Sequence, residues 1–449
     1  MTIDHASSGE SSGESSVADS SVAESSSAES SGVDSSAVES SSESSAESPA
    51  ERRARRDLIA AYQPGFALPA AFYADDAIYR RDLEAVFFRH WIYAAHVSQL
   101  PAAGCYRVVE LGGESIILAR ARDDRIRAFA NVCRHRGSRI CAGAGKASAL
   151  VCPYHGWTYG LDGELRSRRA MPTDFKRAEH ALKAVRCEVF HGLIFINLDP
   201  NAHDLTPAVQ ALDSCLDVYQ LAHAKVACAQ TYAVEANWKL AVENFMECYH
   251  CAPAHAEYAR RHALTSPDDN ARLRPAMRRE AKRCGFSLRE VGASKSAQAR
   301  ARRTDATPHY YARNALYPPF ATGSEDGAPL APLLGEVADY GGGVADIQIG
   351  PVSFGALYAD HAVLYRFVPR GAQATEMELV WLVAADAEPG ADYDPDRLTW
   401  LWRVTSEADK QIIADNQRGI NSRFYQPGPL SKMEAYTTDF IEWYLSQIA

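Results

Sequence analysis

Apolar positions at helical spacing mark the first patterned segment of the chain, residues 51–91. Their spacing predicts one or two helices, and Pro64-Gly65 predicts a turn between them. Asp75 or Asp76 is expected to cap the second helix, because a short acidic side chain accepts hydrogen bonds from the first free backbone N–H groups. We expect this segment to be a helical lead-in that packs on the large C-terminal domain.

From residue 92 the pattern changes to short stretches that alternate between apolar and polar side chains. Hairpins are predicted around Gly112 and around Gly163, since glycine readily adopts the backbone conformations of tight turns. A further pair of strands is predicted over 185–198. Residues 92–200 therefore predict a small all-β domain.

Residues 201–449 mix both kinds of pattern. The predicted elements are a helix over 238–251, strands over 361–369 and 375–384, a long helix from Asp394-Pro395 to about Gly419, and a last helix over about 434–448. Alternating strands followed by long helices are typical of a twisted antiparallel sheet that packs against helices. The predicted fold class is α+β.

Composition sets the N-terminal segment apart from the rest of the chain. Residues 1–50 are rich in Ser and hold ten Asp or Glu but no Lys or Arg, which accounts for the whole formal charge of −10. Such a segment buries too little apolar surface to offset its ordering entropy, so we expect a disordered tail. It is expected to be a solubilising tail, with phosphorylation or partner binding as the alternative. The remainder has no net positive charge, which argues against nucleic-acid binding.

The apolar runs and the number of cysteines indicate the cellular compartment of the protein. No apolar run approaches the roughly eighteen residues of a membrane span, and no signal peptide is apparent at the N-terminus. Ten Cys in a chain of 449 residues without such a signal favour a reducing, cytoplasmic compartment. We therefore expect metal ligation rather than a disulfide framework.

The stretch NVCRHRGSRICAGAGKASALVCPYHGW holds two Cys/His pairs. Cys133-x-His135 and Cys152-x-x-His155 are separated by sixteen residues. Two Cys and two His are the ligands of a Rieske [2Fe-2S] centre, where His replaces Cys on one iron. A structural zinc site is the alternative, but its usual spacing groups Cys with Cys and His with His. The order therefore favours a Rieske cluster.

The stretch NWKLAVENFMECYHCAPAH provides a second constellation. On a continuous helix, Glu243, Glu247 and His250 share one face, because they lie four and three residues apart. His255 would point away on an unbroken helix, but Pro253 disfavours helix and can bring His255 back beside His250. Two His and one carboxylate form the facial triad of non-haem Fe(II) oxygenases.

The carboxylate of this triad does not follow from spacing. Glu247 is close to both His in the sequence, whereas Asp409 lies far away in the long helix, before the word NQRG. Both remain open at this point. A di-iron site is disfavoured, because it needs a second Glu-x-x-His motif on another helix.

The quoted motifs resemble those of a known family. CRHRGSR and CPYHGW resemble the Rieske domain of ring-hydroxylating-type oxygenases, and NWKxxxENxxECYHCxxxH resembles their catalytic domain. Within the large oxygenase subunits, the chain is most similar to the branch that acts on quaternary ammonium compounds, which includes glycine betaine, choline and carnitine oxygenases. The resemblance covers roughly residues 55–449. It implies a Rieske domain joined to a helix-grip, START-like catalytic domain.

The resemblance also implies roles for single residues. His250, His255 and Asp409 would bind the mononuclear iron, with Asp415 as the alternative to Asp409. Glu247 would be the acid that bridges the two metal centres. The family context further implies a homotrimer, in which the Rieske domain of one subunit faces the iron of its neighbour. There His155 would form a hydrogen bond with Glu247 across the interface.

The implied activity is that of an O2-dependent monooxygenase that hydroxylates an N-methyl group of a betaine-type compound, with loss of formaldehyde. The alternatives are ring hydroxylation of an aromatic acid, C-hydroxylation of choline or carnitine, and an electron-transfer protein without catalysis. No nicotinamide or flavin motif is present, so NAD(P)H would act through a separate reductase or ferredoxin. Candidate walls of an aromatic cage for the cation are Phe245, Tyr310, Tyr311, Phe354, Tyr358 and Tyr365.

Overall fold

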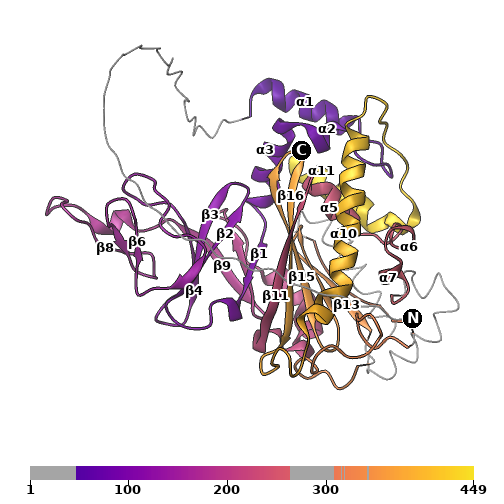
Figure 1. Cartoon of the computed structure of the whole chain (residues 1–449). Coiled ribbons are helices and arrows are strands. Elements are labelled where there is room, and N and C mark those ends of the chain that lie inside the picture. Colours follow the sequence, from indigo (N-terminus) through magenta and orange to yellow (C-terminus); the bar gives the residue numbers. More distant parts are fainter. Residues whose placement is uncertain (1–46, 263–307, 315, 318, 341–342) are drawn as a thin grey trace, which may run out of the picture. The chain divides into compact units, whose positions relative to one another are not determined.

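The computed structural model describes residues 47–262, 308–314, 316–317, 319–340 and 343–449. Residues 49–449 form one compact unit (Figure 1). The Ser-rich segment predicted to be disordered lies outside the described residues, apart from its last four. Among the described residues, no helix has both the length and the apolar character that a membrane span requires.

The lead-in is helical, as its pattern predicts. It contains α1 Pro49–Ala60, α2 Ala71–Ala74, α3 Asp76–Asp82 and the π-helical turn η1 Leu83–Phe87. Asp75 caps α3, where its Oδ1 accepts hydrogen bonds from the backbone N–H groups of Ala77 at 2.7 Å and Ile78 at 3.1 Å. At the other end of α3, buried Asp82 bonds to Trp238, Lys239 and Tyr444 of the C-terminal region, which anchors the lead-in there.

Ten short strands follow. They are β1 Ile92–His96, β2 Cys105–Leu111, β3 Glu114–Arg120, β4 Ile126–Ala130, β5 Ala144–Lys146, β6 Leu150–Val151, β7 Thr158–Tyr159, β8 Leu165–Ser167, β9 Ala184–Phe190 and β10 Leu193–Asn197. Seven form an antiparallel sheet in the order β1-β10-β9-β4-β3-β2-β5, and β6-β7-β8 form a second sheet. The predicted hairpins are confirmed as β2–β3, β7–β8 and β9–β10. Gly163 has φ +84°, and a Cβ there would collide with the ring of Phe129.

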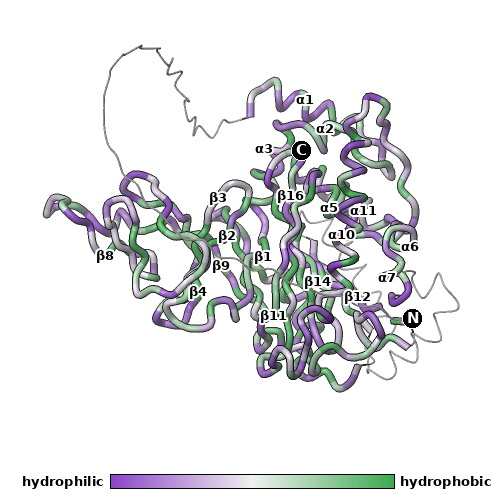
Figure 2. The backbone as a smooth tube through the Cα atoms, in the orientation of Figure 1, coloured by the Kyte–Doolittle hydropathy of each residue, from purple (hydrophilic) through white to green (hydrophobic). Residues whose placement is uncertain are grey.

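A six-stranded antiparallel sheet forms the larger C-terminal part. Its strands are β11 Ala224–Val234, β12 His309–Asn314, β13 Val344–Ile349, β14 Ser353–Leu357, β15 Ala362–Gly371 and β16 Ala374–Ala384, in the order β11-β16-β15-β14-β13-β12. Apart from β12, these strands are rich in hydrophobic residues (Figure 2). The main helices are α4 Thr206–Leu216, α5 Trp238–Phe245, α10 Pro395–Ile420 and α11 Ala435–Ile448. The α+β prediction is confirmed.

Side chains alternate between the two faces of the large sheet. Both faces are apolar, because successive residues of its strands belong to two different hydrophobic cores. Tyr365 packs against Trp402 of α10, with ring centroids 5.4 Å apart, in a core that also holds residues of α5 and α11. Leu364, the next residue back, lies in a second core with Leu212 of α4. One face of the sheet therefore meets α5, α10 and α11, and the other meets α4.

The prediction of one helix over 238–251 is wrong. Helix α5 ends at Phe245, and the chain then turns before two single-turn helices, α6 Cys251–Ala254 and α7 Ala256–Ala259. Glu243, Glu247 and His250 consequently do not share one helix face. Short 3₁₀ turns connect other elements, at Val97–Gln99, Arg177–His180, Asp217–Tyr219, Leu221–His223 and Lys432–Glu434.

Candidate metal centres

Two loops of the all-β region carry the first set of candidate ligands. Cys133 follows β4, and Cys152 lies between β6 and β7. In each loop a glycine four residues further on donates its N–H to the Cys carbonyl, Gly137 at 2.9 Å and Gly156 at 3.0 Å. Both glycines have positive φ, +77° and +73°, which other residues adopt only with strain. The two loops thus form the same tight turn around their cysteines.

The four side chains of these loops converge. The thiols of Cys133 and Cys152 are buried, whereas His135 and His155 are exposed and their Nδ1 atoms lie 3.1 Å apart. The ring of His135 stacks on buried Trp157, with centroids 4.9 Å apart, which fixes its orientation. Two inner sulfurs and two outer imidazoles fit the ligands of a Rieske [2Fe-2S] cluster.

Tyr159 is a polar neighbour of these ligands that the sequence did not single out. Its hydroxyl lies 3.3 Å from Cys133 Sγ and accepts the backbone N–H of Arg134 at 3.0 Å, which leaves its own proton for the sulfur. Burial opposes ionisation of Cys152, but hydrogen bonds, first from the backbone of Tyr154, outweigh it and lower the pKa of the thiol. A lowered thiol pKa favours the thiolate form that binds metals.

The second set of candidate ligands gathers around the turn after α5. His250 directly precedes α6, and His255 lies between α6 and α7 in a non-helical conformation with φ −144°. Their ring centroids are 5.1 Å apart. Pro253 lies inside α6, so the two His approach through a single helical turn and the extended residue after it. The expected proximity holds, although the break at Pro253 is not its cause.

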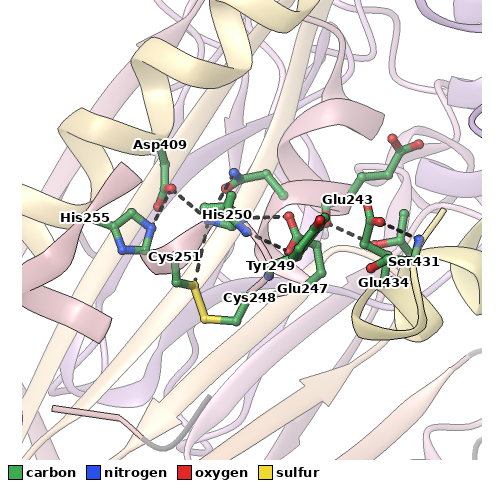
Figure 3. Close-up of polar contacts among 12 residues, drawn as sticks. Glu243, Glu247, Cys248, Tyr249, His250, Cys251, His255, Asp409, Ser431 and Glu434 are labelled. Carbon is green, nitrogen blue, oxygen red and sulfur yellow. Dashed lines mark hydrogen bonds and ion pairs between the residues drawn. A yellow bond between two sulfur atoms is a disulfide. The ribbon is translucent and has the colours of Figure 1, made fainter. Parts of the chain in front are cut away.

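Asp409 reaches this pair from the distant helix α10 (Figure 3). Its Oδ1 lies 3.2 Å from His250 Nε2 and 3.1 Å from His255 Nε2. Burial would raise the pKa of Asp409, but the hydrogen bonds from both imidazoles lower it. Two ring nitrogens and one ionised oxygen converge on one point, and this donor set fits a facial site for Fe(II).

Cys251 also lies near the two imidazoles. One donor atom each of His250, Cys251 and His255 lies within 4.8 Å of the others. However, Cys251 forms a disulfide with Cys248, whose Cα is 4.9 Å away, so it offers no thiolate. The sequence predicted ligation rather than disulfides for the cysteines. This pair departs from that prediction, because the turn after α5 brings the two together.

Glu247 supports His250 from the side opposite Asp409 (Figure 3). Its Oε1 lies 2.6 Å from His250 Nδ1, and its Oε2 accepts the backbone N–H groups of Tyr249 and His250. Burial lowers the pKa of His250, but the hydrogen bonds of Asp409 and Glu247 outweigh it and raise that pKa to about 9. A carboxylate on the second ring nitrogen is the usual partner of a metal-bound imidazole.

Two other acidic residues of the sequence analysis lie elsewhere. Asp415 is exposed on α10 and pairs with Gln411 and Arg418, away from the two His. The carboxylate of Glu243 accepts the hydroxyl of Tyr73 at 3.0 Å, and burial raises its pKa to about 8. The partner residue of Glu243 was missed, since 170 positions separate the two residues and no local pattern joins them.

The fold and these sites define a class: an oxygenase with a Rieske domain and a mononuclear iron domain. Family models agree with both parts. Residues 90–193 match the Rieske [2Fe-2S] domain, and residues 221–449 match the ring hydroxylating alpha subunit (catalytic domain).

Similar proteins narrow the family. The chain is 35% identical over 408 residues to the glycine betaine monooxygenase oxygenase subunit of Chromohalobacter salexigens. The matched region covers 88% of each chain. It is 34% identical over 399 residues to the Pseudomonas aeruginosa protein of the same name, covering 88% of this chain and 91% of that one. A carnitine monooxygenase oxygenase subunit of Escherichia coli is 42% identical over 205 residues, 44% of this chain and 54% of that one.

Solved structures share the fold. The quaternary ammonium Rieske monooxygenase CntA, in complex with L-carnitine, matches with a TM-score of 0.63 at 22% identity over 86% of this chain and 98% of that one. Naphthalene 1,2-dioxygenase from Rhodococcus sp. matches with a TM-score of 0.64 at 19% identity over 90% of this chain and 99% of that one. The chain therefore belongs to the Rieske oxygenases, as a ring-hydroxylating-type alpha subunit. Members of this family are oxidoreductases that carry a Rieske [2Fe-2S] cluster and a mononuclear iron.

Proposed function

We propose that this chain is the terminal oxygenase subunit of a monooxygenase that hydroxylates an N-methyl group of a betaine-type quaternary ammonium compound. The hydroxylated methyl group is lost as formaldehyde and leaves the demethylated amine. The observation that carries the proposal is the match to glycine betaine monooxygenase subunits over 88% of the chain. The convergence of His250, His255 and Asp409 supports this proposal, in which they would form the site of the chemistry.

The proposal assigns the metal ligands. Cys133, His135, Cys152 and His155 hold the cluster, and His250, His255 and Asp409 hold the iron. When bound, the two centres supply electrons and activate O2 for insertion into a C–H bond. The reaction consumes O2, two electrons and two protons, and it releases water besides the hydroxylated substrate.

The protein side chains position these groups. Glu247 holds His250 through Nδ1 and so keeps Nε2 directed at the metal position. Tyr159 donates a hydrogen bond toward the sulfur of Cys133, which stabilises negative charge on the inner ligands. Glu247 is proposed as the bridge to His155 of a neighbouring subunit. No described hydrogen bond or ion pair joins these two residues within one chain.

The partners belong to the proposal as well. A homotrimer would bring each Rieske domain to the iron of its neighbour, and one quaternary ammonium Rieske monooxygenase of the same fold transfers electrons between subunits. A separate reductase, with or without a ferredoxin, would deliver electrons from NAD(P)H. Apart from the bonded pair Cys248 and Cys251, the described cysteines form no disulfide, which fits a reducing cytoplasm. The proposed domains are a tail over 1–50, a lead-in over 51–91, a Rieske domain over 92–200 and a catalytic domain over 201–449.

A single-turnover experiment tests the activity. The iron-loaded protein is reduced without oxygen and then given O2 together with glycine betaine, carnitine, choline or an aromatic acid. Formaldehyde and a product lighter by one methyl group are the expected result. A product that gains oxygen without formaldehyde would instead establish hydroxylation of a ring, of choline or of carnitine.

A further inference from the structure

Strand β13 places two polar side chains on an apolar face of the large sheet. Ala345 and Ile347 belong to the core shared with α4, whereas Val344 belongs to the core shared with α5, α10 and α11. Because side chains alternate along a strand and β13 pairs without a bulge, Asp346 and Gln348 point to the same side as Val344. That side also carries the proposed iron ligands.

Neither polar group is fully compensated by the residues around it. Gln348 is 0% exposed, and neither its Nε2 nor its Oε1 has a hydrogen-bond partner among the described residues. Asp346 is half-buried, and among the described residues its carboxylate accepts one side-chain hydrogen bond, from Asn314 Nδ2 at 2.5 Å. Burial raises the pKa of Asp346 to about 7, since that single bond offsets the lost hydration only in part. A fully buried amide without hydrogen-bond partners, such as that of Gln348, is costly and calls for a reason.

Aromatic side chains surround the pair. Tyr310 of β12 and Phe354 of β14 are the cross-strand neighbours of Gln348 on either side. Besides burial, the charge of Asp346 raises the pKa of the Tyr258 and Tyr310 hydroxyls, which places both near its carboxylate. Binding sites for small molecules are usually lined by aromatic side chains with a few polar groups among them.

The same aromatic residues connect this face with the proposed iron site. The ring of Tyr258 packs edge-on against His255, with centroids 5.6 Å apart. The hydroxyl of Tyr365 lies 3.2 Å from Ser406 Oγ, one helical turn before Asp409. Asp346 therefore acts on a residue that touches an iron ligand, while it makes no direct contact with the ligands among the described residues.

We propose that Asp346 binds the cationic head of a quaternary ammonium substrate and that Gln348 binds its carboxylate end. The inference rests on the proposed function and names the residues that select the substrate class. A quaternary ammonium has no N–H to donate, so a nearby carboxylate and aromatic faces are the groups that stabilise it in place of water. The amide of Gln348 donates to the substrate carboxylate and so keeps it apart from Asp346. An aromatic acid, which lacks the cation, would be repelled by Asp346.

Binding measurements without turnover test this assignment. Anaerobic, fully metal-loaded protein is titrated with glycine betaine and with tetramethylammonium, which has the cation but no carboxylate. Asp346→Asn is expected to weaken binding of both ligands by about 10- to 100-fold, the effect of losing one charged partner. Gln348→Met is expected to weaken binding of glycine betaine only. Asp346→Glu retains the charge and should bind tetramethylammonium more tightly than Asp346→Asn does.

A matched control distinguishes an effect specific to Asp346 from a general effect of removing a carboxylate from the sheet. Glu376→Gln makes the same carboxylate-to-amide change at the Arg370 pair of the same sheet, and it should leave both affinities unchanged. Wild-type affinity for tetramethylammonium in folded Asp346→Asn, judged by an intact Rieske spectrum, would overturn the role of Asp346. Failure of the wild-type protein to bind any quaternary ammonium compound, with binding of an aromatic acid, would instead overturn the proposed function itself.

Discussion

Substitution of Glu247 can distinguish the proposed electron transfer from metal binding. It contacts His250 through Nδ1, the ring nitrogen that does not face Asp409, and it is not itself among the proposed ligands. Glu247→Gln is expected to leave the cluster and the iron in place but to lower turnover by about 100-fold or more, because the proposed bridge to His155 is weakened. Metal analysis measures the iron content, the Rieske spectrum measures the cluster, and formaldehyde release measures turnover.

Glu257 provides the control for this prediction. It is an exposed carboxylate on α7, close in sequence to the same ligands, and Glu257→Gln should retain normal turnover. Normal turnover of Glu247→Gln with full metal content would show that Glu247 does not bridge the centres.

Asp409 and Asp415 lie on the same helix but have opposite surroundings. Asp409 faces both imidazoles, whereas Asp415 is exposed and pairs with Arg418. Asp409→Ala is expected to remove most of the mononuclear iron and to leave the Rieske spectrum unchanged, because one of the three proposed protein ligands is lost. Asp415→Asn should bind iron like the wild type. Iron counted per chain after desalting decides between them, and equal iron in both variants would reopen the ligand assignment.

Tyr159 is expected to tune the cluster rather than to hold it. Its hydroxyl donates toward Cys133 Sγ, and a hydrogen bond to a ligand sulfur favours the reduced cluster. Tyr159→Phe should therefore lower the reduction potential, by about 40 mV if the bond contributes about 1 kcal/mol to a one-electron step. A spectroscopic redox titration measures the shift. An unchanged potential in a variant with the full cluster would contradict this role.

At the scale of elements, a buried ion pair holds the helix that leads into the proposed iron site. Lys239 of α5 and Asp82 of α3 are both fully buried, and Asp82 also accepts from Trp238 at 2.9 Å and Tyr444 at 2.6 Å. Lys239→Met leaves Asp82 without its cation and is expected to cost about 3–5 kcal/mol of unfolding free energy. Denaturant unfolding measures the loss.

The double variant Lys239→Met, Asp82→Asn tests the cause. It removes both charges and keeps an acceptor for Trp238, so it should be more stable than Lys239→Met alone. Arg53→Met is the control, because the Arg53–Asp57 pair on α1 is mostly exposed and contributes little. A double variant as unstable as the single one would assign the loss to packing rather than to charge.

The sequence predicted elements well where local chemistry decides them. Glycines with positive φ fixed the hairpins, and Asp75 fixed the start of α3. The break after Phe245 was not predictable, because the heptad-like spacing of NWKLAVENFMECYH continues through it. The register of β12 was equally unpredictable from local pattern: Tyr311 faces the core around α4, opposite to Phe354 and Tyr365. No local motif marks Asp346 as a site residue.

At the scale of the whole molecule, the exposure of the two imidazoles proposed to bind the Rieske cluster calls for a partner surface. His135 and His155 present their rings to solvent, although a cluster that passes electrons to an iron must approach it closely. Within the described residues, neither of them contacts Glu247. A ring of subunits with head-to-tail contacts would cover the exposed imidazoles and complete each active site from two chains.

Complementation between two inactive variants tests this arrangement. Cys152→Ser disables the cluster and Asp409→Ala disables the iron, so each variant alone should be inactive. Trimers co-expressed from both chains in equal amounts place an intact cluster before an intact iron at about one junction in four, so about a quarter of wild-type turnover is expected. Mixing the two purified trimers without subunit exchange should give none. If electrons passed only within a chain, the co-expressed protein would be inactive, because no chain would hold both centres.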